Sequence, residues 1–169
     1  MKVIETERLI LRRFMPDDAP FMLELMNDAD YIKNIGDRGI RTKEEAKNSL
    51  LNGPMKMYEE HGFGLFLTEL KENHTPMGMC GLIKREGLED VDIGYAFLPG
   101  YRGKGYAVEA AKASLEYGKN DQKLKRVVAI TSVDNEGSIK LLERIGLQYE
   151  KLVTLPNDDE ELKLFGINF

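Results

Sequence analysis

Hydrophobic and polar residues follow one another along this chain with two different spacings. Short runs of apolar, aromatic and β-branched residues are separated by segments in which the apolar residues recur every three or four positions. The first spacing predicts β-strands and the second predicts amphipathic helices. In chain order, the pattern predicts a strand, helices, three strands, a helix, a strand, a helix and two final strands. This order indicates one mixed α/β domain over residues 1–169, with about seven strands and about four helices.

The predicted strands also suggest how the sheet is built. Strands 63–70, 77–84 and 91–97 follow one another with short turns, which predicts an antiparallel meander. Strand 125–133 is joined to strand 91–97 through a helix, so these two strands should pair in parallel. The sheet is therefore expected to be mixed and mostly antiparallel. The remaining predicted strands cover residues 7–14, 147–154 and 160–168.

Between the first two predicted strands the chain is expected to be mainly helical. An apolar stripe from Phe21 to Met26 predicts one buried helix face. Thr42, with Glu45 three residues later, forms a capping-box pattern that predicts the start of another helix. Residues 28–41 show no clear period and are expected to form a loop or short helical turns.

The segment 91–111 carries the clearest chemical signal. Its aromatic and β-branched strand ends at Leu98-Pro99-Gly100, and small and apolar residues at helical spacing begin at Gly105. The free N–H groups of a helix N-terminus, next to bare glycines, form a concavity for an anion such as a pyrophosphate. The spacing does not match a P-loop, and the dinucleotide fingerprint fails because Val108 stands where its third glycine is needed.

Three motifs resemble those of one enzyme family. Residues Arg102-Gly103-Lys104-Gly105-Tyr106-Ala107 resemble the Arg/Gln-x-x-Gly-x-Gly/Ala loop of the GNAT superfamily of N-acetyltransferases, which binds the pyrophosphate of coenzyme A (CoA). Residues 5–12 followed by Asp17-Asp18-Ala19 are similar to the N-terminal signature of its RimJ/RimL-like branch, the ribosomal-protein-alanine N-acetyltransferase-like enzymes. Val133-Asp134-Asn135, with Ser138, resembles the motif whose asparagine binds the pantetheine arm. The resemblance covers nearly the whole chain.

This resemblance implies a fold and an activity. The fold would be the single-domain GNAT fold, with a CoA cleft between the central strand and the following parallel strand. The activity would be acetyl transfer from acetyl-CoA to a primary amine by direct attack, and the branch suggests a protein N-terminal amine or a small amine as acceptor. The residues expected to bind CoA are Phe97, Leu98, Arg102, Gly103, Lys104, Gly105, Tyr106, Ala107, Asn135 and Ser138.

The resemblance also assigns catalytic roles, with alternatives left open. A backbone N–H at Phe97 or Leu98 would bind the oxyanion. Many family members place a proton-donating tyrosine seven residues after the pantetheine asparagine, but this chain has Leu142 there. Ser138 is therefore the expected acid, although it could equally serve only as a helix-capping hydroxyl, and water could protonate the thiolate. Asn135 likewise could be a plain helix N-cap.

The general base is the least determined role. Asp92, Glu89 and Glu69 are acidic residues on or near the predicted sheet. Asp92 either faces the acceptor cleft or lies on a solvated strand face. Strand alternation places Asp92 on the face opposite to Ile93 and Tyr95.

Composition narrows the remaining possibilities. A single cysteine, Cys80, excludes an internal disulfide, and with only two histidines no metal-ligand cluster of recognisable spacing is expected. A formal net charge of −5 argues against nucleic acid as a main partner. Without an apolar run long enough to span a membrane, the protein is expected to be cytoplasmic, and a homodimer would be unsurprising. The competing functional hypothesis is a non-catalytic acyl-CoA-binding sensor or adaptor with the same fold.

Overall fold

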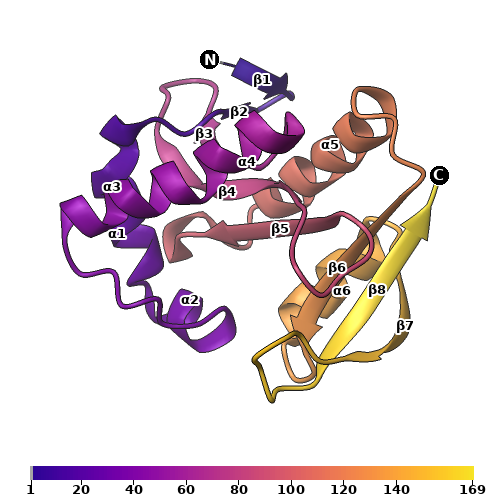
Figure 1. Cartoon of the computed structure of the whole chain (residues 1–169). Coiled ribbons are helices and arrows are strands. Elements are labelled where there is room, and N and C mark those ends of the chain that lie inside the picture. The colour runs from indigo at the N-terminus through magenta and orange to yellow at the C-terminus, as the bar shows by residue number, and fades with distance from the viewer. Residues whose placement is uncertain (1) are drawn as a thin grey trace.

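The computed structural model describes residues 2–169, and a single mixed sheet runs through them (Figure 1). Its strands follow the order β1-β2-β3-β4-β5-β6-β8-β7, and every neighbouring pair is antiparallel except β5 with β6. The strands are β1 (Lys2–Glu5), β2 (Leu9–Arg12), β3 (Leu65–Leu70), β4 (Pro76–Ile83), β5 (Asp92–Phe97), β6 (Arg126–Ser132), β7 (Gln148–Val153) and β8 (Leu162–Asn168).

Six α-helices lie in this part of the chain: α1 (Ala19–Met26), α2 (Ala29–Asn34), α3 (Lys43–Asn52), α4 (Pro54–His61), α5 (Tyr106–Asn120) and α6 (Glu136–Arg144). Thr42 caps α3 as predicted, because its side chain accepts a hydrogen bond from the Glu45 N–H. The extra helices arise where residues 29–34 form α2 and where Gly53 separates α4 from α3. The predicted mixed α/β fold is confirmed, with eight strands because the short β1 pairs with β2.

The two faces of the sheet carry separate cores. Under α5 and α6, one cluster contains Ile93 and Phe97 of β5 together with Ala110, Leu115 and Leu142 from the two helices. On the opposite face, a second cluster joins apolar residues of α1 and α3 to β3 and β4, and Ala96 of β5 packs against it. The period-two alternation of β5 therefore holds in the structure, and neighbouring β5 side chains serve different cores.

Strands β5 and β6 pair over a very short length. Their register contains the single pair Asp92 with Val128, and the Val128 N–H donates to the Val91 carbonyl at 3.0 Å. Beyond this pair the strands diverge, as Figure 1 shows. Because the last strand, β8, pairs with the other edge of β6 over seven residue pairs, the divergence opens a gap in the middle of a continuous sheet.

Close approach of β4 to β5 depends on glycine at position 78. A Cβ atom at Gly78 would lie 2.3 Å from the Ala96 carbonyl oxygen and 2.8 Å from the Phe97 Cα atom. The backbone of β4 or that of β5 would therefore have to move. We expect Gly78→Ala to lower the free energy of unfolding by about 2 kcal/mol, measured by urea denaturation. Gly100→Ala is the control, because a Cβ there meets nothing within 4 Å, and its effect should stay within about 0.5 kcal/mol. Equal stabilities for the two variants would contradict this account.

Candidate active site

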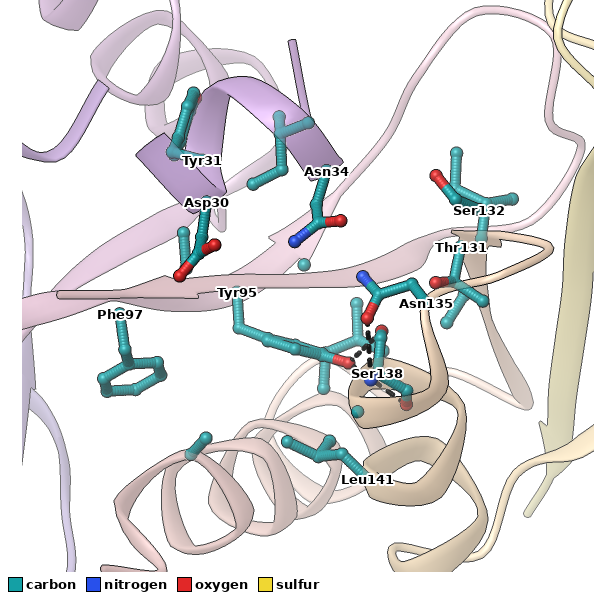
Figure 2. Close-up of a pocket in the computed structure, with 18 of the residues that line it drawn as sticks. Asp30, Tyr31, Asn34, Tyr95, Phe97, Thr131, Ser132, Asn135, Ser138 and Leu141 are labelled. Carbon is teal, nitrogen blue, oxygen red and sulfur yellow. Dashed lines mark hydrogen bonds between the residues drawn. The ribbon is translucent and has the colours of Figure 1, made fainter. Parts of the chain in front are cut away.

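A cleft of about 1060 Å³ opens where β5 and β6 diverge. Its walls come from β5, β6, the N-terminal ends of α5 and α6, and α2. Figure 2 shows Asp30, Tyr31 and Asn34 of α2 on one side and Asn135 and Ser138 of α6 on the other, with Tyr95 between them. The residues predicted from the sequence that line this β5/β6 cleft are Asp92, Phe97, Arg102, Gly103, Gly105, Tyr106, Ala107, Asn135 and Ser138.

The glycine loop forms an anion-binding concavity at one end of the cleft. Gly103 and Gly105 have φ angles of +75° and +81°, in the left-handed region that side chains disfavour. Gly105 is the N-cap of α5, and the first intrahelical bond runs from the Glu109 N–H to the Gly105 carbonyl at 3.0 Å. The N–H groups of residues 106–108 therefore have no intrahelical acceptor, and the Gly105 N-cap has no side chain to cap them. An anion here would meet free donors and the positive end of the helix dipole.

The N-terminal segment holds this loop in place. Arg8 donates through Nη1 to the Lys104 carbonyl at 3.0 Å and through Nε to Glu109 Oε1 at 2.7 Å. Its guanidinium also lies 4.4 Å from the centre of the Tyr106 ring. Thr6 donates to the other Glu109 oxygen at 2.5 Å. The two sequence motifs at residues 5–12 and 102–107 are thus one physical unit, and exposed Lys104 contributes its carbonyl to it.

Arg102 connects the loop to α2. Its guanidinium donates to the Phe97 carbonyl at 2.8 Å, to Asp28 Oδ2 at 3.1 Å and to the Asp30 carboxylate. Sequence reasoning missed these two aspartates, since they lie about seventy residues earlier in a segment without a clear period. Arg102 therefore ties α2, which forms one wall of the cleft, to the loop that follows the C-terminal end of β5.

The register of β5 decides which of its amides face the cleft. The Leu98 N–H donates to the Met77 carbonyl at 2.9 Å, so Leu98, Ala96 and their alternate neighbours direct their backbone groups to β4. The N–H groups of Tyr95 and Phe97 consequently face the gap beyond the last β6 pair. This corrects the expected role of Leu98 as oxyanion donor, because its N–H is already bonded and its side chain packs in the core with α1 and α3.

Asn135 and Ser138 meet at the start of α6. The Asn135 side-chain oxygen accepts a hydrogen bond from the Ser138 N–H at 3.2 Å, so Asn135 does cap the helix. Figure 2 shows its amide nitrogen directed into the cleft, which leaves that end of the side chain for a ligand. The Ser138 hydroxyl lies 2.6 Å from the Tyr95 hydroxyl. Burial raises the pKa of Tyr95 to about 12, with an opposing contribution from the hydrogen bond to Ser138.

The three candidate bases, Asp92, Glu89 and Glu69, lie in different environments. Asp92 lines the cleft with 1% of its surface exposed, so the solvated strand face is excluded. Arg85 binds both of its oxygens at 3.1 Å. Glu69 lies outside the cleft, where its carboxylate contacts Arg12 and His74, and Glu89 is exposed.

Residues 2–169 also bear on metal binding and on membrane crossing. Within that range, no group of three or more His, Cys, Asp or Glu side chains is placed to hold a metal ion. In the same residues, none of the helices has both the length and the apolar character needed to cross a membrane.

Comparison with known sequences decides the family. The profile described as "Acetyltransferase (GNAT) domain" matches residues 8–148. The chain belongs to the GNAT acetyltransferase family. The predicted enzyme class, an acetyl-CoA-dependent N-acetyltransferase, and the predicted GNAT fold are thereby confirmed. Since the matched region runs from Arg8 to Gln148, it contains the glycine loop, Asn135 and Ser138.

Similar proteins agree with this membership. An uncharacterized N-acetyltransferase, YnaD, from Bacillus subtilis (strain 168) is 32% identical over 147 residues, covering 87% of this chain and 83% of YnaD. A GNAT-family acetyltransferase structure from Bacillus anthracis is 29% identical with a TM-score of 0.79, covering 98% of this chain and 97% of that one. RimL, a ribosomal L7/L12 alpha-N-protein acetyltransferase solved with CoA, shares the fold with a TM-score of 0.85 at 16% identity, covering 100% and 98%.

The buried Asp92 should make stability depend on pH in a characteristic direction. Burial raises its carboxyl pKa, against the opposing charge of Arg85. The folded protein then binds this proton more tightly than the unfolded chain, so the group costs stability as the pH rises from its unfolded pKa through its folded pKa. We expect Asp92→Asn to gain free energy of unfolding relative to the wild type as the pH rises, measured by urea denaturation at a series of pH values.

Asp37→Asn provides a control of opposite sign. The Asp37 pKa is lowered by hydrogen bonds from the Arg41 side chain and the Gly39 N–H, so ionisation there adds stability as the pH rises. The free energy of unfolding of Asp37→Asn should therefore fall relative to that of the wild type as the pH rises over the same range. If the stability difference for Asp92→Asn stays constant with pH, the account of Asp92 is wrong.

Proposed function

We propose that this enzyme acetylates primary amines by direct attack on acetyl-CoA, with protein N-terminal amines as its acceptor class. The observation that supports this most is the position of the glycine loop, at the end of a cleft whose β5 edge has unpaired amides. Support for the acceptor comes from the RimJ/RimL-like signature at residues 5–12 and from the fold shared with RimL. Such an enzyme would work in the cytoplasm.

The residues of the cleft can be given roles in this reaction. The N–H groups at the start of α5, with Gly103 and Gly105, would bind the pyrophosphate of CoA. The unpaired backbone of β5 and the Asn135 amide nitrogen would bind the pantetheine arm. The N–H of Phe97 or Tyr95 would then donate to the oxyanion, since both face the gap.

Proton transfer from the amine is the most demanding step. Tyr95 lies three positions after Asp92 along the extended strand, a rise of about 10 Å. An amine attacking near Tyr95 would therefore pass its proton to Asp92 through water. Ser138 lies across the cleft from α2 and beside Tyr95. It would donate a hydrogen bond to the thiolate as the C–S bond breaks.

A non-catalytic acyl-CoA sensor is the second candidate. The observation that favours it is Leu142, which stands where many family members have the proton-donating tyrosine and is buried with 1% exposure. Position 142 is therefore occupied by a core residue and supplies no acid to the cleft.

Release of free CoA thiol from acetyl-CoA tests the proposed function. The acceptors are N-terminal peptides, polyamines and amino sugars, each with a control lacking acceptor. We expect acceptor-dependent release, highest with peptides that have a free α-amine. Release only with polyamines or amino sugars would refute the N-terminal acceptor, and tight CoA binding without release across the panel would favour the sensor.

The glycine loop can be tested through binding. Gly103→Ala forces a side chain into a left-handed residue next to the expected phosphates, so we expect CoA affinity to fall about tenfold by calorimetry. Gly62→Ala is a matched control, since Gly62 also has a positive φ with nothing near its Cβ position, but it caps α4 and does not line the cleft. Both variants should lose about 1 kcal/mol of stability. Equal CoA affinity in the two folded variants would refute the loop assignment.

A further inference from the structure

Tyr95 of β5 contacts α6, a helix that does not belong to the β4–β5 hairpin. Its side chain extends to the first turn of α6, where its hydroxyl lies 2.6 Å from Ser138 Oγ (Figure 2). Both residues line the cleft and both are partly buried. The contact therefore spans the gap left by the diverging strands, at the site where the sulfur of a bound CoA would lie under the proposed function.

The direction of this hydrogen bond determines what Ser138 can do. A serine hydroxyl has one proton, which can point either to Tyr95 or into the cleft. The Tyr95 hydroxyl has two acceptors within reach, Ser138 Oγ at 2.6 Å and the Ser138 carbonyl at 3.5 Å. The shorter distance is that of a good O–H···O bond and the longer one is not. Either hydroxyl could donate across the 2.6 Å contact, but the phenol is the more acidic of the two, which favours donation from Tyr95 to Ser138 Oγ and leaves the serine proton free.

We propose that Tyr95 is a positioning residue that directs the Ser138 hydroxyl proton toward the sulfur of bound CoA. This inference rests on the proposed function, which puts the pantetheine arm in the cleft. When the tetrahedral intermediate collapses, the C=O bond reforms, the C–S bond breaks and its electron pair goes to sulfur. Ser138 stabilises the resulting thiolate with a hydrogen bond, and solvent later supplies the proton that makes the thiol.

The proposed pair would replace an acid that the α6 helix lacks. Leu142 fills the position of the usual tyrosine with a buried apolar side chain. Tyr95 enters the cleft from β5 instead, and it remains a hydrogen-bond donor at neutral pH because its hydroxyl is protonated there. Its ring also packs against the core under α5 and α6, which fixes its direction.

The test measures the pKa of the CoA thiol while CoA is bound. Thiolate absorbs far more strongly than thiol in the ultraviolet, so bound CoA can be titrated without turnover. The signal is the absorbance difference between each variant with CoA and the same variant with desulfo-CoA, which cancels the absorbance of adenine and of the tyrosines. Cys80 is the only cysteine, and burial raises its pKa to about 12, so it stays protonated during the titration. A hydrogen bond to sulfur stabilises the thiolate, so the bound thiol pKa should rise by about one unit in Ser138→Ala and in Tyr95→Phe.

Three further variants and kinetics complete the design. The Tyr95→Phe/Ser138→Ala double variant should raise the thiol pKa no further than Ser138→Ala alone, because Tyr95 acts through Ser138. Tyr117→Phe removes a hydroxyl of α5 that bonds Gly62 and Gln122 and does not line the cleft, so it should leave the thiol pKa unchanged. In acetyl transfer, we expect Tyr95→Phe to lower kcat about tenfold with KM for acetyl-CoA within twofold. Ser138→Thr, which keeps a hydroxyl, should recover part of the loss from Ser138→Ala.

The outcomes separate this inference from the proposed function. Wild-type protein that does not bind CoA would overturn both. CoA binding with an unchanged thiol pKa in Tyr95→Phe would overturn only the positioning role, as would a loss of CoA affinity and thermal stability without a shift in thiol pKa. A rise of the thiol pKa in both single variants that is not additive in the double variant would support it.

Discussion

The separation of β5 from β6 is the constraint on which the rest of this structure depends. Two parallel strands in the middle of a sheet normally satisfy each other's backbone groups along their whole length. Here the ladder stops at Asp92 and Val128, so the following amides of β5 need other partners. Both α5 and α6 contribute residues of their N-terminal ends to the lining of this cleft. A local failure of strand pairing thus produces the cleft, its donors and its electrostatic polarity together.

Salt bridges from distant segments then support this opening. Arg8 and Thr6 bind Glu109 in the first turn of α5, and Arg102 binds α2. The Arg8 and Arg102 side chains are 42% and 41% exposed, and Asp30 is 52% exposed, so these ion pairs add little stability. Their main effect is geometric: they keep the loop and the α2 wall in register with β5.

The sequence predicted the parts of the fold that local patterns determine. Strand and helix order, the parallel pairing of β5 with β6 and the glycine loop all follow from periodicity and from the positions of glycine and proline.

Details that depend on pairing between distant parts of the chain cannot be obtained from local patterns. The resemblance allows Phe97 or Leu98 as the donor at the strand end, and only the register with Met77 shows that the Leu98 N–H is already bonded. Asp92 is buried between β4 and β6, where Arg85 of the turn that follows β4 binds its carboxylate. The Tyr95 contact had a partial signal in strand alternation, which placed Tyr95 opposite to Asp92, but the position of α6 over that face came only from the structure.

The bonds of Arg102 have a thermodynamic consequence. One guanidinium binds the carboxylates of Asp28, the N-cap of α2, and of Asp30 within α2, and it also binds the Phe97 carbonyl. An anion that recruits this guanidinium must share or replace those bonds, so occupancy of the loop changes the free energy with which α2 is held. Linkage is reciprocal, and any ligand that alters α2 must change the affinity of the loop by the same factor. Arg102 thereby links binding at the glycine loop to the position of α2.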